Sequence, residues 1–210
     1  LARKARDGIE VRLLLDSLGS LWTRRGFVRP LLEAGGEVGH FLPVLPVQRR
    51  WSANLRNHRK LVVVDNAAAM AGGMNLSTLF MGPEPCPERF LDASVFLRGP
   101  AVQDIQEIFL NDWQYATGHD QDLLAEKLAA PEAPGDRIVQ VAASGPDVPE
   151  DIMHDALVCA ITEAQERIWI VTPYFVPDEP LLKSLCLQAR MGREVRLVIP
   201  RRSNHRIADW

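Results

Sequence analysis

An internal repeat is the feature that most narrows the folds open to this chain of 210 residues. The segment ARDGIEVRLLL (5–15) matches ARMGREVRLVI (189–199) at seven of eleven positions, with Gly8 aligned to Gly192. Each copy has the pattern of a helix end, a glycine and a buried strand, because glycine commonly follows a helix C-terminus and the next run is apolar. The recurrence of such a unit predicts an α/β protein built from two related lobes.

Between the two copies, strand patterns and helix patterns alternate. Apolar and alternating runs predict strands over 8–16, 55–65, 67–76, 89–99, from 137 onward, 168–175 and 194–200. Helical spacing predicts helices from Pro100 to about Gly118, from about Pro149, and over roughly 179–190. The fold class is therefore α/β, and we expect a mixed β-sheet flanked by helices in each lobe.

A polar segment, GHDQDLLAEKLAAPEAPGD (118–136), separates the two lobes. It combines charged residues with prolines, a composition typical of a linker. We therefore expect a first lobe over residues 1–117 and the start of a second lobe over residues 137–210.

Composition narrows the class of protein. With 47% hydrophobic and 24% charged residues, the chain has the balance of a globular protein. Its net charge of −3 argues against a broad nucleic-acid-binding surface. Cys86, Cys159 and Cys186 have neither CxxC nor Cys–His spacing, so we expect no zinc site and no disulfide framework. The sequence has no apolar run long enough to predict a membrane-spanning helix.

The segment NHRKLVVVD (57–65) carries the residues best suited to chemistry. In a strand, alternate side chains share a face, so His58 and Lys60 point the same way and Arg59 points opposite. A neutral imidazole beside an ammonium suits attack on an anionic phosphoryl group. The lysine attracts the non-bridging oxygens while an imidazole nitrogen reaches phosphorus. The apolar residues that follow are expected to bury the strand and hold the pair rigidly.

Four further residues extend the candidate site. Asp65 lies five residues after Lys60, so alternation places it on the other face, and we expect it at the strand end, bonding to backbone or shaping the turn. Gly72 and Gly73 allow close backbone approach or a positive φ. Asn75 supplies an amide donor that could join Lys60 on the phosphoryl oxygens.

Basic residues crowd into the segment that ends at this motif: Arg49, Arg50, Arg56, Arg59 and Lys60. Such a cluster is often a solvated basic face, but beside a candidate phosphoryl site it favours anion binding. We therefore predict substrate-binding roles for Arg59, Gly72 and Gly73. For Trp51, packing and contact with lipid head groups both remain open.

The spacing of these residues carries a family resemblance. His58-x-Lys60-x4-Asp65, followed by Gly72-Gly73-x-Asn75, resembles the HKD motif of the phospholipase D superfamily. Further segments are similar to one branch, the bacterial cardiolipin synthases: LLLDSLGS (13–20), RNHRKLVVVD (56–65), LRGPAVQDIQEIFLNDW (97–113), SGPD (144–147) and TPYFVPDE (172–179).

The resemblance implies a reaction that needs no metal or other cofactor. In the family, two HKD lobes meet so that two histidines flank one phosphate. One histidine forms a phosphohistidine, while the other protonates the departing alcohol and activates the incoming one. In the synthases, one phosphatidylglycerol donates its phosphatidyl group to a second, giving cardiolipin and glycerol. Carried over, His58 is the nucleophile, Lys60 and Asn75 are oxyanion ligands, and Asp65 is a supporting residue.

The chain departs from the family pattern because it contains one H-x-K-x4-D and no second copy. The repeat offset places a partner for His58 near position ~242, past Trp210. We therefore expect an internal piece of a longer enzyme, whose second HKD motif comes from the same protein. The resemblance also implies phosphatidylglycerol as an anionic lipid partner, and association with the bacterial inner membrane surface through segments outside this chain.

Two other functions are weighed against the transferase. A hydrolase of the same superfamily, either a phospholipase or a nuclease, would share the phosphohistidine, so the motif leaves water and a glycerol-type acceptor both open. Nucleic acid is not expected as a partner because the net charge is negative. An inactive lipid-binding relative is disfavoured by the intact His58, Lys60 and Asn75.

Overall fold

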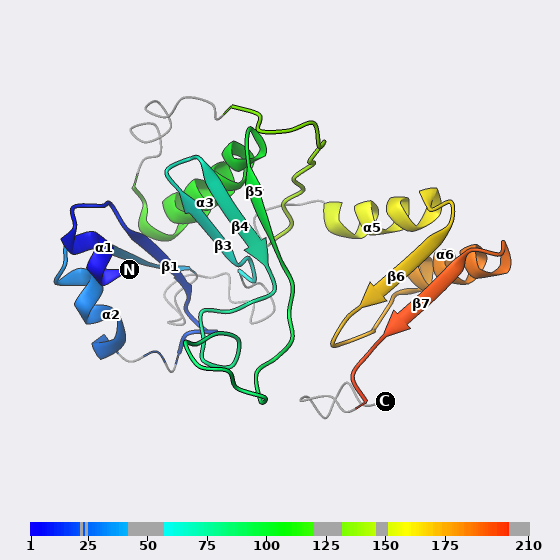
Figure 1. Ribbon diagram of the computed structural model, residues 1–210, viewed down its shortest axis with the longest axis horizontal. Coiled ribbons are helices and arrows are strands. Elements are labelled where there is room, and N and C mark those ends of the chain that lie inside the picture. Colours follow the sequence, from blue (N-terminus) through cyan, green and yellow to red (C-terminus); the bar gives the residue numbers. More distant parts are fainter. Residues whose placement is uncertain (22, 24, 42–56, 120–131, 146–150, 202–210) are drawn as a thin grey trace. The chain divides into compact units, whose positions relative to one another are not determined.

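The computed structural model describes residues 1–21, 23, 25–41, 57–119, 132–145 and 151–201. The chain divides into two compact units (Figure 1). The first comprises Leu1–Val141 with Gly145–Asp147, and the second comprises Ala142–Ser144 with Val148–Trp210. Each unit combines β-strands with helices that cover them, so the α/β class and the sheets flanked by helices are confirmed.

The first unit begins with a parallel strand pair and two helices. Its elements are α1 (Ala2–Arg6), β1 (Arg12–Asp16), α2 (Arg25–Leu32) and β2 (Glu37–Phe41), and β1 pairs with β2. The sequence patterns predicted neither α2 nor β2. A glycine in the middle of β2 explains part of this, because glycine weakens a strand pattern. A Cβ on Gly39 would lie 3.0 Å from Leu14 and 3.2 Å from Trp113, so the glycine lets neighbouring elements approach closely.

An antiparallel sheet and a long helix complete the first unit. The strands are β3 (Leu61–Val64), β4 (Ala68–Gly72) and β5 (Ser94–Arg98), in that spatial order. Helix α3 (Ala101–Thr117) packs against this sheet and against β2 (Figure 1). Its predicted ends are confirmed: Pro100 precedes it, and Gly118 ends it with a φ of 73°. Ala69, Val102 and Ile105 form the buried core between helix and sheet.

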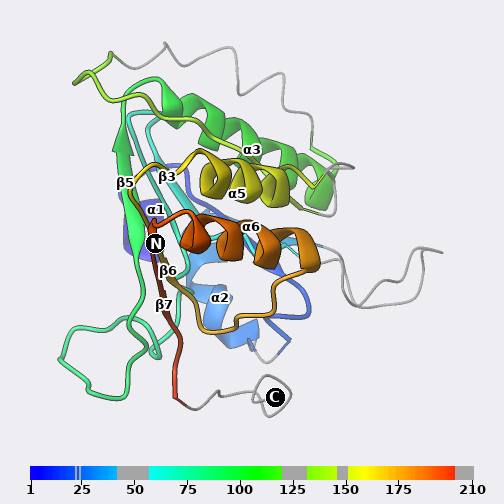
Figure 2. The same cartoon turned by 90° about the vertical axis from the view of Figure 1, so that its right-hand side faces the viewer.

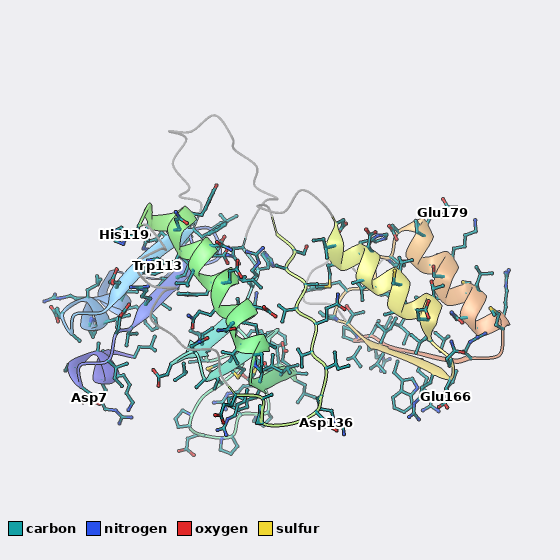
Figure 3. The ribbon with its side chains drawn as sticks, turned by 90° about the horizontal axis from the view of Figure 1, so that it is seen from above. Asp7, Trp113, His119, Asp136, Glu166 and Glu179 are labelled. Carbon is teal, nitrogen blue, oxygen red and sulfur yellow. The ribbon has the colours of Figure 1, made fainter. Side chains whose placement is uncertain are left out.

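The second unit has two parallel strands and two helices. The elements are α5 (Ile152–Glu163), β6 (Arg167–Val171), α6 (Glu179–Arg190) and β7 (Glu194–Val198). Figures 2 and 3 show the two helices side by side on one face of the strands. Ile161, Ile168 and Leu185 form the core. The amide of Gln188 donates to the carbonyl oxygens of Ile161 (2.8 Å) and Thr162 (2.7 Å), which satisfies carbonyls at the end of α5.

The sequence repeat is also a structural repeat. Gly8 and Gly192 end α1 and α6 with φ values of +82° and +86°. The amide of Gly8 donates to the carbonyl oxygen of Ala5 at 3.0 Å, and that of Gly192 donates to Ala189 at 3.1 Å. The flanking hydrogen bonds correspond as well: Ile9 to Lys4 in one copy and Arg193 to Gln188 in the other, each 3.1 Å. Both copies therefore leave the helix through the same glycine turn and enter a strand of a parallel pair.

Some strand predictions differ from the structure. The strand predicted from residue 137 is not formed within the described residues 132–145. There Ile138 is 99% exposed, whereas Val141 packs against the core of the first unit. The two units accordingly divide near Val141, a few residues beyond the predicted start of the second lobe. Among the described residues, every helix is too short or too polar to cross a membrane.

Candidate functional site

His58 and Lys60 lie on the segment that leads into β3. Residues 57–60 precede β3, and the amide of Gly72 donates to the carbonyl oxygen of Lys60 at 3.3 Å, continuing the pairing with β4 by one residue. His58 is exposed to solvent, and Lys60 is half-buried. The ammonium of Lys60 donates to the carbonyl oxygen of His58 at 2.6 Å. A solvent-accessible imidazole therefore stands beside a lysine that is anchored to the same segment.

Burial and the charges of two carboxylates act on the Lys60 ammonium. Burial lowers the pKa of Lys60, and the negative charges of Asp92 and Asp16 oppose this change without cancelling it. The lysine is thus partly dehydrated, and electrostatic attraction is stronger in such a place than in bulk water. These surroundings suit an ammonium that binds the oxygens of a phosphoryl group.

Gly72 and Gly73 allow a neighbouring segment to approach. Neither has a positive φ. A Cβ on Gly72 would overlap the hydroxyl of Ser94 and lie 2.7 Å from the carbonyl oxygen of Ala93. A Cβ on Gly73 would lie 2.5 Å and 2.7 Å from the two carboxylate oxygens of Asp92. Gly72 therefore makes room for Ala93 and Ser94, and Gly73 for the Asp92 carboxylate; their predicted contact with substrate stays a prediction.

Asn75 lies in the connection between β4 and β5, three residues after Gly72. Its side chain is exposed, and its carbonyl oxygen accepts a hydrogen bond from the amide of Ser77 at 2.8 Å. Gly72 is hydrogen-bonded to Lys60, so the segment that leads to Asn75 starts next to the lysine. Its role as an oxyanion ligand stays a prediction.

Asp65 lies at the other end of β3 from His58. It forms the tight turn to β4 with Asn66, and both residues have positive φ, 53° and 51°. The amide of Ala67 donates to the carbonyl oxygen of Val64 at 3.0 Å, which closes a turn of type I′. Seven residues of extended chain separate Asp65 from His58 by roughly 20 Å. The structure thus places Asp65 where it shapes the turn, and it does not bring the carboxylate to His58.

The Arg59 side chain reaches α3. Its guanidinium lies 2.5 Å from one carboxylate oxygen of Asp112. The Asn57 amide donates to the other Asp112 oxygen at 2.7 Å. These contacts hold the Arg59 guanidinium against α3, and its predicted contact with substrate stays a prediction. Three other arginines of the basic cluster lie outside the described residues, as does Trp51: Arg49, Arg50 and Arg56.

Comparison with known proteins identifies the family. Residues 157–210 match the family model described as cardiolipin synthase, PLD-like domain. The cardiolipin synthase of Alkalihalophilus pseudofirmus is 37% identical over 210 residues, which cover 99% of this chain. The chain belongs to the cardiolipin synthase group of phospholipase D-like proteins. The cardiolipin synthase of Halalkalibacterium halodurans is also 37% identical over 99% of the chain, and cardiolipin synthase 1 of Bacillus cereus is 36% identical over all of it.

The chain spans 41% of the length of the first two of these cardiolipin synthases and 42% of the third. The similarity extends over the whole chain, so it includes the segment with His58 and Lys60 as well as the part matched by the family model.

Three carboxylates at the candidate site of this chain were not predicted from sequence. Asp92 lies against Gly73, its charge acts on the pKa of Lys60, and Asp112 holds the residues on either side of His58. Asp16 accepts from the amides of Leu18 and Gly19 and, at 3.3 Å, from that of Asn57. Each comes from an element distant in sequence, so motif spacing could not reveal it. Two of them could have been noticed in the sequence: Asp16 lies at the end of a predicted strand, and Asp112 lies in a segment similar to the synthases.

Proposed function

We propose that this chain supplies the nucleophilic half of a phosphatidyltransferase of the cardiolipin synthase type. The reaction transfers a phosphatidyl group from one phosphatidylglycerol to another and gives cardiolipin and glycerol. The observation that carries the proposal is the pairing of an exposed His58 with a half-buried Lys60 in a chain similar along its whole length to cardiolipin synthases.

The first step is nucleophilic displacement at phosphorus. An imidazole nitrogen of His58 attacks, a nitrogen–phosphorus bond forms, and the bond from phosphorus to the glycerol head-group oxygen breaks. That oxygen leaves with the electron pair and takes a proton from an acid contributed by the second HKD lobe. Lys60, joined by Asn75, stabilises the negative charge on the non-bridging oxygens.

The second step releases the phosphatidyl group. A primary hydroxyl of another phosphatidylglycerol attacks the phosphohistidine and loses its proton to the group that acted as acid before. The nitrogen–phosphorus bond breaks and regenerates His58. If water were the acceptor, the product would be phosphatidic acid, which is the hydrolase alternative. The names of the relatives favour transfer.

The repeat supports a two-lobe protein whose second lobe continues past this chain, with the second lobe starting near residue 137 after a linker over 118–136. Arg12 of β1 pairs with Glu10 and lies over the ring of Trp113 of α3, 5.7 Å from its centroid. The aligned Arg196 pairs with Glu194, yet its side chain is 67% exposed compared with 16% for Arg12. A second helix of the α3 type would cover this face, and the second H-x-K-x4-D is expected ahead of that helix, as the first motif precedes α3.

The substrate sets the place of action. Phosphatidylglycerol is an anionic lipid, so the protein is proposed to work at a membrane surface, the bacterial inner membrane. Its attachment is assigned to segments outside this chain.

The test uses the complete protein with vesicles of phosphatidylglycerol, and mass spectrometry measures cardiolipin and phosphatidic acid. Cardiolipin with release of glycerol is expected, and its formation should fall when glycerol is added in excess. Phosphatidic acid as the sole product would replace the transferase with a hydrolase. Replacing His58 with alanine should abolish turnover, and a tenth of the parent rate in that variant would reassign the nucleophile. Residues 1–210 by themselves are expected to be inactive.

A further inference from the structure

We propose that Asp112 of α3 is a positioning residue, which fixes the direction of His58 and Lys60 by holding the two residues on either side of His58. The inference rests on the proposed function of His58, and it adds a residue to which the HKD spacing gives no role. Asp112 contacts neither the histidine nor the lysine in the interactions described above. It acts through their neighbours.

One carboxylate binds both flanks of the histidine. Its oxygen Oδ1 pairs with the Arg59 guanidinium at 2.5 Å, and Oδ2 accepts from the Asn57 amide at 2.7 Å. The Asn57 side-chain oxygen in turn accepts from the backbone amide of Arg59 at 2.9 Å. The three residues form a closed arrangement around His58, which we call the Asp112 clamp: Asn57, Arg59 and Asp112.

The clamp is rigid because it is buried and anchored. Asp112 is 3% exposed, and the Arg59 side chain is 13% exposed. A buried carboxylate in a hydrogen-bonded ion pair holds a fixed geometry, because any other arrangement leaves a charge without a partner in a dry place. Helix α3 itself is held to the unit by buried side chains of the same face: Val102, Ile105 and Trp113.

The clamp controls direction through strand geometry. In extended backbone, adjacent side chains point to opposite sides, so fixing residues 57 and 59 toward α3 turns His58 and Lys60 away from it. The hydrogen bond from the Lys60 ammonium to the His58 carbonyl then links the two groups, and a shift of this backbone moves both. Attack at phosphorus needs an aligned nucleophile, and a displacement of about 1 Å can cost about 100-fold in rate.

The first test compares Asp112→Asn with Asp104→Asn in the complete protein. Asp104 is an exposed carboxylate on the same helix, so its replacement is the matched control. With phosphatidylglycerol in mixed micelles, and rates expressed per folded molecule, Asp112→Asn should lower kcat by ~10- to 100-fold, because alignment is lost. Its KM should change by less than about threefold, because the groups that bind the lipid remain. The control should match the parent in both constants.

A second test asks whether the clamp acts as a unit. Arg59→Gln should lower kcat to a similar extent. The double variant with Asp112→Asn should have a kcat no lower than that of the less active single variant, because either substitution already breaks the pair. If the fold-losses in kcat of the two substitutions multiplied in the double variant, the clamp would be overturned. So would an Asp112→Asn variant whose kcat stays within twofold of the parent.

A readout independent of activity uses the ring resonances of the histidines in a labelled protein. Asp112→Asn should shift or broaden the His58 signals and leave those of His154, in the second unit, unchanged. Unmoved His58 signals would overturn the clamp even in a protein that does not act on phosphatidylglycerol. An inactive parent with shifted His58 signals would instead overturn the proposed function and leave the clamp standing.

Discussion

The ammonium of Lys60 donates a hydrogen bond to the carbonyl oxygen of His58, two residues earlier and 2.6 Å away. The lysine side chain therefore folds back along its own strand segment. It also lies under the electrostatic influence of Asp92 and Asp16, whose charges partly offset the effect of burial on its pKa. A positive charge held in this way is prepared for an anionic substrate before the substrate arrives.

Replacing Lys60 with methionine should lower kcat/KM by about 100- to 1,000-fold, because one preorganised partner of the phosphoryl oxygens is lost. The measurement is cardiolipin formation by the complete protein. Lys183→Met, which removes an exposed lysine from α6, is the control and should leave the rate unchanged. A loss of less than threefold at Lys60 would show that another group binds the oxygens.

Replacing Gly73 with alanine should displace the Asp92 carboxylate, because the new methyl group would lie 2.5 Å from one of its oxygens. We expect cardiolipin formation to fall by about tenfold or more, since misplacement near a reacting group is costly. Gly26→Ala, in α2, meets no atom within 4 Å and should behave as the parent. Full activity of Gly73→Ala would mean that the Asp92 position is unimportant for turnover.

Replacing Asp65 with valine should destabilise the first unit by about 1–2 kcal/mol, because a β-branched side chain is strained at a φ of 53°. Asp65→Asn should keep the stability, since asparagine tolerates this conformation. Urea unfolding followed by circular dichroism measures both. If Asp65→Asn were stable but inactive, the carboxylate would have a chemical role that its place in the turn does not explain.

The second unit should lose stability as the pH rises above about 6.5 and passes the raised pKa of His154. Burial lowers the pKa of His154, but the nearby carboxylates raise it overall; Asp178 lies 2.7 Å from Nε2 and Asp155 lies 3.5 Å from Nδ1. The folded pKa therefore exceeds the unfolded one. The stabilisation is complete below the unfolded pKa, about 6.5, and disappears as pH passes the folded pKa.

Hydrogen exchange in α5 and α6 across this pH range measures the effect, after correction for the intrinsic pH dependence of exchange. His154→Gln should remove the pH-dependent part of the protection. His119→Gln, an exposed histidine of the first unit, should leave it in place. Equal pH dependence in the parent and in His154→Gln would assign the effect to another group.

Local patterns predicted much of this fold. Pro100 and Gly118 marked the ends of α3, and the parallel strands β6 and β7 were recognisable from their apolar runs. By contrast, β2 was missed because Gly39 at its centre weakens the strand pattern. The glycine is needed for the close approach of Leu14 and Trp113, which is a tertiary contact that the sequence does not reveal. The strand expected from residue 137 is not formed within the described residues 132–145, where Val141 packs onto the core of the first unit instead.

The candidate site divides in the same way. His58 and Lys60 could be found because they are two residues apart, and residues at that spacing in a strand share one face. Asp92 and Asp112 could not be assigned, because each reaches the site through the fold rather than through the motif. Arg59 shows the same limit: its positive charge predicted a substrate anion, and motif spacing gave no sign of its hydrogen bond to a carboxylate 53 residues away.

The Asp112 clamp also bears on how the chain folds. The β3–β4 hairpin closes through a tight turn, so it can form from local contacts on a fast timescale. The clamp instead joins residues separated by 53 and 55 positions, and Asp16 joins Asn57 across 41. Closing such long loops costs chain entropy before any contact repays it. His58 and Lys60 are therefore expected to reach their final geometry late, when α3 docks, so a newly made chain would acquire its chemistry as one of the last events of folding.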